Sequence, residues 1–145
     1  MKEFFEYLKS GTIRRSSPDI NRSLSMKDEA IRKLSSLNER IEKIGIRDDN
    51  ANEYVEQSYD IIMFLIRSKL YKEGYSSSGL GAHEAEVSYL KELSFNENQI
   101  EFIDKLRYFR NGILYYGKRF DSVYAKKVIK FLKEIYPKLV NLINN

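Results

Sequence analysis

Apolar residues recur along this chain three or four positions apart, and no stretch alternates with a period of two for long enough to predict a strand. A short helix is expected over Lys2 to Lys9, ended by Gly11. A start signal at Ser16 to Asp19 then opens a long helix that runs to about Lys43 and is stopped by Gly45. The apolar stripe of this long helix consists of Ile20, Leu24, Ile31, Leu34, Leu37 and Ile41.

The middle of the chain predicts a central helix, a loop and a shorter helix. The central helix is expected from Ala51 to Tyr71. Its inward side chains are expected to be Tyr54, Val55, Tyr59, Ile62, Phe64 and Leu65. Gly74 to Gly81, with three serines inside it, has the composition of a loop, and a helix over His83 to Leu93 follows.

Capping residues mark the next helix, which is expected from Glu97 to Tyr116. Asn96 is a good N-cap, and Gln99 stands three residues later, which is the spacing of a capping box. Gly117 is a typical C-terminal signal. The ends of this helix are therefore set by the local sequence.

Asp121 or Ser122 is expected to cap the last helix, and Pro137 should kink or break it because proline removes a backbone hydrogen bond and clashes with the preceding turn. The whole pattern predicts an all-α, up-and-down bundle of about five helices. Residues 1–145 are expected to form a single domain, in which residues 1–17 are a short N-terminal helix and a connecting segment.

The helix from Glu97 to Tyr116 has two distinct faces at 100° per residue. One arc, the expected core stripe, contains Phe102, Leu106, Phe109, Ile113 and Tyr116. The other arc contains Ile100, Ile103 and Leu114 interleaved with Arg107, Arg110, Asn111 and Lys118. Large apolar residues among cations suggest that this second arc meets a second copy of the helix or a bound ligand. The alternative is that one subunit buries both arcs and pairs the arginines with acids.

Composition narrows the possible chemistry. The 145 residues are 42% hydrophobic and 32% charged, which excludes a wholly disordered chain. With 0 Cys there is no disulfide, thiol nucleophile or thiolate zinc site, and a cytoplasmic location is expected. The single histidine, His83, is too little for an intrachain His-rich metal site, so no metal or cofactor is expected. The longest apolar run, Ile61 to Ile66, is too short to span a membrane.

The net charge of +4 is unevenly distributed. From Glu101 to Asn145 there are ten Lys or Arg against four acids, whereas Met1 to Ile100 has fifteen against seventeen. A basic excess of this kind suggests contact with phosphates or with an acidic partner. Lys126, Lys127, Lys130 and Lys133 form a basic stripe on the last helix that is more typical of a solvated face than of a nucleic-acid contact.

The stretch from Arg110 to Gly117 reads Arg-Asn-Gly-Ile-Leu-Tyr-Tyr-Gly, and it resembles the HEPN domain family of archaeal type. The resemblance covers most of the chain. Further matching segments are Glu6 to Lys9, Ile13 to Arg15, Pro18-Asp19, Tyr59-Asp60 with Arg67, Gly74-Tyr75, His83 to Glu86 and Leu106 to Asn111.

Active members of this family carry Arg-Asn-x-x-x-His, and the resemblance implies a metal-independent ribonuclease that works across a dimer of such helices. Arg110 and Asn111 match the motif, but Tyr115 occupies the position of the histidine. Since a tyrosine ordinarily titrates near pH 10, it makes a poor general base, and weak or no nuclease activity is expected. Some members carry a tyrosine that a nucleotidyltransferase partner modifies, and here Gly117 stands in its place.

Three functions follow as hypotheses. The first is a homodimeric binding module that uses Arg107, Arg110, Asn111 and Tyr115 to hold RNA or a nucleotide, or to dock a nucleotidyltransferase. Tyr108 and Lys118 are candidates to join this site, and Ile100, Ile103 and Leu114 are the expected apolar dimer interface. The second is a toxin-type ribonuclease with Tyr115 or His83 as the base, where His83 could serve only if the fold brings it beside Arg110. The third is a purely structural dimerisation protein.

Overall fold

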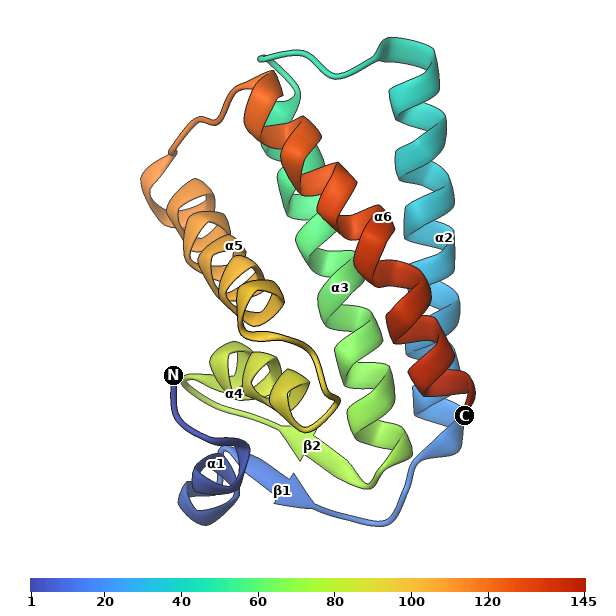
Figure 1. Cartoon of the computed structure of the whole chain (residues 1–145), viewed down its shortest axis with the longest axis vertical. Helices are drawn as coiled ribbons and strands as arrows, with labels where there is room; N and C mark the ends of the chain where they lie inside the picture. Colours follow the sequence, from blue (N-terminus) through green and yellow to red (C-terminus); the bar gives the residue numbers. More distant parts are fainter.

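The computed structural model describes residues 1–145 and contains six α-helices, one 3-10 turn and a small antiparallel sheet (Figure 1). In chain order the elements are α1 (Phe4–Ser10), β1 (Ile13–Arg15), α2 (Ile20–Ile44), α3 (Ala51–Lys72), β2 (Tyr75–Ser77), α4 (Ala82–Ser88), the 3-10 turn η1 (Tyr89–Lys91), α5 (Glu97–Tyr116) and α6 (Ser122–Asn144). The expectation of an all-α architecture is confirmed, with six helices where about five were expected. The helix expected over His83 to Leu93 is shorter, because α4 ends at Ser88 and the chain continues as the 3-10 turn η1.

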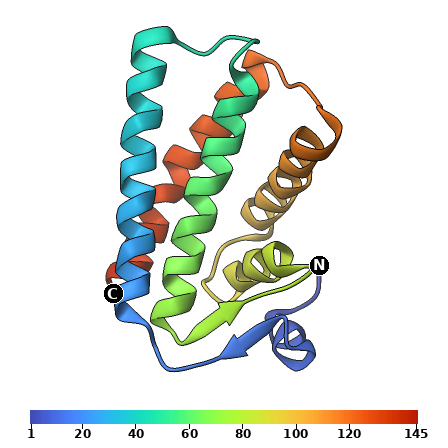
Figure 2. The same ribbon diagram turned by 180° about the vertical axis from the view of Figure 1, so that it is seen from behind.

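The four long helices α2, α3, α5 and α6 alternate in direction, and α3 lies at the centre (Figure 1). α2 and α6 pack along α3, while α4 and α5 cover its remaining side. Viewed from behind, the two strands and α1 close the end of the molecule beneath α4 (Figure 2). The central position of α3 explains why it is apolar on nearly every side.

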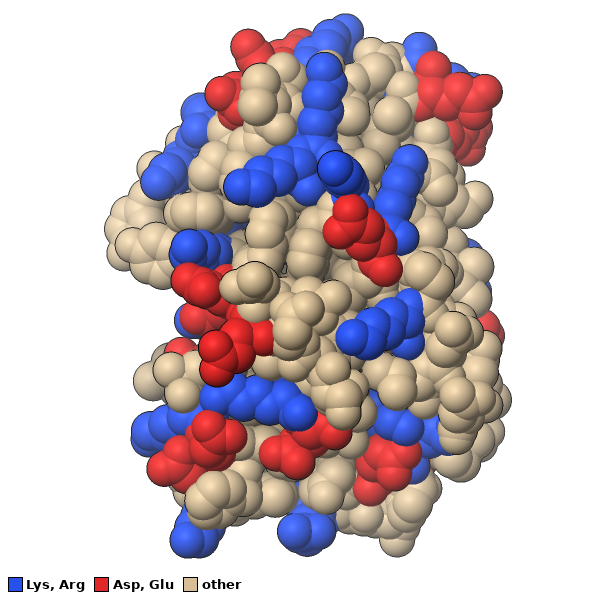
Figure 3. All heavy atoms as spheres, in the orientation of Figure 1, with Lys and Arg blue, Asp and Glu red and all other residues tan.

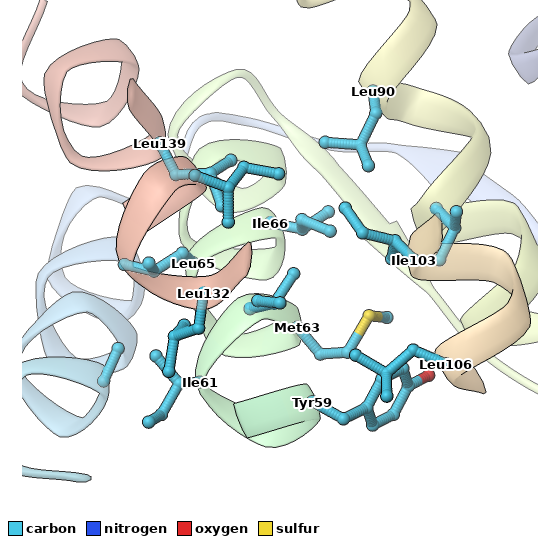
Figure 4. Packing of buried hydrophobic residues seen from close by; sticks show 14 of the residues in the cluster. Tyr59, Ile61, Met63, Leu65, Ile66, Leu90, Ile103, Leu106, Leu132 and Leu139 are labelled. Carbon is cyan, nitrogen blue, oxygen red and sulfur yellow. The ribbon is translucent and has the colours of Figure 1, made fainter. Parts of the chain in front are cut away.

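The core is one cluster of buried hydrophobic side chains built around α3. Leu65 faces Leu132 and Leu139 of α6, and Met63 points toward α5 (Figure 4). Tyr59 lies beside Leu106, with its hydroxyl at the edge of the cluster (Figure 4). The hydroxyl of Tyr59 therefore lies where the core meets the candidate functional site.

The sheet was not expected, because its strands are three residues long and cannot show a clear alternation. β1 pairs with β2, and Ile13, Arg14 and Arg15 stand opposite Ser77, Ser76 and Tyr75. The chain turns from α3 into β2 at Gly74, which has φ +83°, and a Cβ built there would lie 2.5 Å from the carbonyl oxygen of Ser16. Only glycine fits this turn without displacing the neighbouring segment.

Local signals at the helix ends are confirmed. Asn96 and Gln99 form the capping box of α5, and Gly117 ends that helix in the left-handed conformation. The Asp121 side chain accepts a hydrogen bond from the backbone of Tyr124 at the start of α6. Pro137 does not break α6, which continues to Asn144 and packs its apolar face on α3 on both sides of the proline.

The apolar stripe of α2 is only partly in the core. Ser23, Ala30 and Leu37 are the residues that α2 buries completely, and they face α3. Ile20, Leu24 and Ile31 remain about half exposed. The expected stripe therefore lies to one side of the contact with α3, and part of it faces solvent.

Candidate functional site

The orientation of α5 differs from the expectation. Ile100 and Ile103 are buried in this chain's own core together with Leu106, so they do not form an exposed dimer interface. Leu114 is the one member of that apolar trio that is exposed. Tyr116, expected in the core, is 86% exposed. The buried arc of α5 includes residues from both expected arcs because the helix packs on α3 and α4. Its contact with α6 is made by the aromatic rings of Phe102 and Phe109.

The same packing turns two arginines of α5 toward α3 and α4. Arg107 donates from Nε to Asp104 at 2.9 Å and lies 3.4 Å from Glu84. Arg110 donates to Asp60 at 3.3 Å, and its guanidinium lies over the ring of Tyr59. For these two arginines the structure agrees with the alternative expectation, in which one subunit buries this arc of the helix and pairs its arginines with acids.

His83, in the first turn of α4, lies near these two arginines and near Arg67 of α3. We call the three arginines and His83 the cationic cluster. Its Nε2 is 3.0 Å from the guanidinium of Arg67, and its Nδ1 is 3.0 Å from the Tyr59 hydroxyl. Because a guanidinium only donates, Nε2 must be the acceptor, and the ring proton resides on Nδ1, which donates to Tyr59. The fold therefore satisfies the condition for His83, because His83 and Arg110 contact the same side chain, Tyr59.

Burial and three nearby arginines hold the pKa of His83 far below its usual value, at about 4. The arginines are Arg67, Arg107 and Arg110, so residues of α3 and α5 act on one histidine of α4. Burial also raises the pKa of the Tyr59 hydroxyl, which keeps it protonated. At neutral pH the centre of the cluster is thus a neutral imidazole surrounded by fixed positive charges.

Acids on α4 anchor the arginines. Arg67 donates from Nε to Glu86 at 2.5 Å, and a second contact to the same carboxylate measures 3.3 Å. Burial raises the pKa of Glu86, while Arg67 opposes this shift. Glu84 accepts from the hydroxyl of Tyr7 at 2.5 Å, and the pKa of Tyr7 is raised to about 12 by burial and by this carboxylate.

Arg110 has the fewest partners of the three arginines. Its Nε is buried and has no hydrogen-bond partner, and its single ion pair with Asp60 is long. Asp60 is itself about one third exposed, so it can release Arg110 to solvent or to another anion. Arg110 is therefore the residue of this cluster that is best placed to bind an added phosphate.

The other predicted site residues gather around a second site on α5. Tyr108, Asn111 and Tyr115 line a pocket of about 410 Å³ with Lys118. The remaining walls are Phe109, Gly112 and Tyr116. Tyr108 is 68% exposed and Tyr115 is 74% exposed, which leaves their ring faces open to a ligand. The predicted residues thus divide into a cationic cluster with Arg107 and Arg110 and an aromatic pocket with the others.

The segment after α5 is held by a residue that sequence reasoning did not single out. Asn52 at the start of α3 donates to the carbonyl of Lys118 at 2.8 Å and accepts from the backbone of Phe120 at 2.8 Å. The ammonium of Lys118 lies over the rings of Phe109 and Phe120. These contacts fix Lys118 at the rim of the aromatic pocket.

Arg67 and Glu86 were noted only as parts of a family pattern, although the sequence contained a signal for them. Arg67 follows an apolar run in the middle of the central helix, where a cation needs a buried acid as its partner. The partner is Glu86, which is 1% exposed. Their pairing across 19 residues could not be predicted from helical periodicity.

Comparisons of the chain with models of protein families, with curated proteins and with solved structures found no match. No helix has both the length and the apolar character needed to cross a membrane. No three His, Asp or Glu side chains are arranged so that they could hold a metal ion. The geometry of the two sites on α5 is therefore the basis for assigning a function to this chain.

Proposed function

We propose that this chain is a HEPN-type protein that binds RNA or a nucleotide in the aromatic pocket of α5. The observation that carries the proposal is the pocket itself, in which exposed tyrosine rings stand beside an amide and an ammonium group. Tyr108 and Tyr115 offer ring faces on which nucleobases stack. Asn111 supplies a donor and an acceptor for a base edge, and Lys118 supplies a positive charge for a phosphate.

The surface around the pocket supports a polyanionic ligand. Lys and Arg side chains gather over the N-terminal half of α6 and the neighbouring end of the molecule (Figure 3). The C-terminal third of the chain carries the whole basic excess. A strand of RNA that leaves the pocket over the lysines of α6 would therefore meet positive charge, next to the acidic side chains at the start of that helix.

The test is binding of a labelled single-stranded RNA at low salt, measured by fluorescence anisotropy. Tyr115→Ala is expected to weaken binding about tenfold because it removes one stacking surface, while Tyr115→Phe keeps most of the affinity. Phe5→Ala, which removes an exposed aromatic ring far from α5 in sequence, is the matched control and should bind like wild type. Unchanged affinity in both Tyr115→Ala and Tyr108→Ala would exclude the pocket as the binding site.

A second candidate, a metal-independent ribonuclease, is favoured by the position of His83. A neutral imidazole is able to take the proton from a 2′-hydroxyl as that oxygen attacks the adjacent phosphorus and the 5′-oxygen leaves. Arg110, whose one ion pair, with Asp60, is long at 3.3 Å, could turn its terminal guanidinium nitrogens to the phosphorane and stabilise its charge. To act as the base through Nε2, His83 must first lose its hydrogen bond from Arg67.

Cleavage of RNA in the presence of a chelator separates this candidate from simple binding. His83→Ala and Arg110→Ala are each expected to lower the rate about 10²- to 10⁴-fold if His83 is the base. Tyr115→His restores the family's motif and tests whether the motif site is geometrically intact. Cleavage that survives both alanine substitutions would come from a contaminant, and complete absence of cleavage leaves the binding function alone.

A further inference from the structure

The exposed part of α2 follows a heptad-like spacing. The positions between Ile20 and Ile41 are separated alternately by four and three residues, which is the spacing of a coiled-coil seam. In order they are Ile20, Leu24, Lys27, Ile31, Leu34, Asn38 and Ile41. Ile20, Leu24 and Ile31 are 51%, 46% and 44% exposed. A row of large apolar side chains at this spacing is typical of a helix that packs against another helix.

The seam lies beside a groove between α2 and α6. Both helices pack on α3, but they hardly touch each other along most of their length (Figure 2). One hollow of about 210 Å³ is lined by Ile20, Leu24 and Ile143, and another of about 460 Å³ by Ile31, Leu34 and Tyr136 among others. The space is therefore shaped for an additional helix on the surface of the bundle.

The order of residues along the seam is symmetrical about its middle. Lys27 stands four residues before Ile31, and Asn38 stands four residues after Leu34. Leu24 stands seven residues before Ile31, and Ile41 seven residues after Leu34. The two polar interruptions are thus equally far from the centre, and so are the flanking apolar residues.

We propose that α2 is a homodimerisation surface on which α2 of a second copy packs in the antiparallel direction. A two-fold axis between Ile31 and Leu34 places Ile31 on Leu34 and Leu24 on Ile41 of the second copy. It also places Lys27 on Asn38 of the second copy, so that each polar residue meets a polar partner. A parallel arrangement at the same spacing would instead oppose Lys27 to Lys27.

Charge at the two ends of the groove supports the antiparallel direction. The hollow near the start of α2 is lined by Lys27 and Lys72, and the one nearer its end by Glu39 and Glu42. Acidic side chains also gather over the C-terminal end of α2, at the upper right of Figure 3. An antiparallel second copy brings the basic end of each groove to the acidic end of the other. This interface is independent of the proposed RNA site on α5.

Sedimentation equilibrium on the purified chain tests the surface. Ile31→Glu is expected to raise the dimer dissociation constant about a hundredfold, because the symmetrical interface would then bury two unpaired carboxylates. Leu114→Glu introduces the same charge at a comparably exposed leucine on α5 and should leave the dimer intact. A dimer lost in Leu114→Glu and kept in Ile31→Glu would overturn the proposal, as would a monomeric wild-type chain.

Disulfide trapping tests the direction of packing and does not depend on a destabilising variant. The chain has 0 Cys, so an introduced cysteine has no competitor. A mixture of Lys27→Cys and Asn38→Cys chains is expected to form a cross-linked dimer on mild oxidation, because these positions meet across the axis. Each variant alone should stay largely uncross-linked. Rapid cross-linking of Lys27→Cys alone, or none in the mixture, would contradict the antiparallel arrangement.

Discussion

Arg67→Met is expected to lower the free energy of unfolding by about 3–5 kcal/mol at pH 7, as measured by urea denaturation. The substitution preserves most of the side-chain volume but leaves Glu86 without its cation. Glu86 is 1% exposed, so water cannot take the place of the guanidinium. Arg67 also donates to His83, and that hydrogen bond is lost at the same time.

A second substitution at Glu86, the partner of Arg67, shows whether the loss of stability comes from the unpaired carboxylate. Arg67→Met combined with Glu86→Leu removes the buried charge altogether, and it should recover most of the lost stability. Arg32→Met breaks an exposed pair with Glu29 and is expected to cost less than about 1 kcal/mol. If the double variant were as unstable as Arg67→Met, the loss would come from packing rather than from an uncompensated carboxylate.

The pH dependence of the Arg67→Met variant follows from the same pair. Without Arg67, only a hydrogen bond with Ser77 opposes the effect of burial, which raises the pKa of Glu86 above its value in the unfolded chain. A carboxyl group with a raised folded-state pKa destabilises the fold as pH rises through the unfolded pKa. The difference from wild type should therefore shrink as the pH falls from neutral toward the pKa of a carboxyl group in the unfolded chain, because Glu86 becomes protonated in the folded variant first.

Helix ends were predictable because capping is local. The capping box of Asn96 and Gln99 needs four consecutive residues, and the glycine at position 117 needs only its own backbone freedom. The strands at Ile13–Arg15 and Tyr75–Ser77 were not predictable, because each depends on pairing with a segment some 60 residues away in the sequence.

The orientation of α5 shows why the site was only partly predictable. Periodicity gives the two faces of a helix, but it does not say which neighbours cover them. α5 buries Ile100 and Ile103 because α4 folds back against it, and that contact turns Arg107 and Arg110 inward. The division of the predicted polar and aromatic residues between an aromatic pocket and a cationic cluster, and the burial of Ile100 and Ile103, therefore required the tertiary structure.

His83 illustrates the same limit. In the sequence it stands 27 residues before Arg110, and a lone histidine near a glycine-rich loop is more often structural than functional. The packing of α4 between α3 and α5 brings three arginines around it. From the sequence, His83 could be expected to act as a base only if it lay beside Arg110. The fold brings these two residues together.

Lowering the pH from 6.5 to 4 is expected to reduce the free energy of unfolding of the wild-type chain by about 2 kcal/mol, because the pKa of His83 is lower in the folded chain than in the unfolded one. The unfolded chain binds a proton at His83 near pH 6.5, whereas the folded chain does so only at about pH 4. Between these values the unfolded state holds the extra proton, so the free energy of unfolding falls as pH falls. Full burial would give a larger loss, but His83 is only half-buried, and solvent reduces it.

Two measurements isolate this residue from the carboxylates that titrate in the same range. His83→Gln keeps an acceptor for Arg67, so it should be modestly less stable than wild type at pH 7, and the two stability curves should converge toward pH 4. Because the chain contains 1 His, its imidazole resonance in proton NMR reports the pKa directly. A midpoint near pH 6.5 would show that His83 is not held among the arginines. A midpoint near pH 4 that rises when RNA is added would show that a bound phosphate offsets their charge, since an added anion favours the imidazolium.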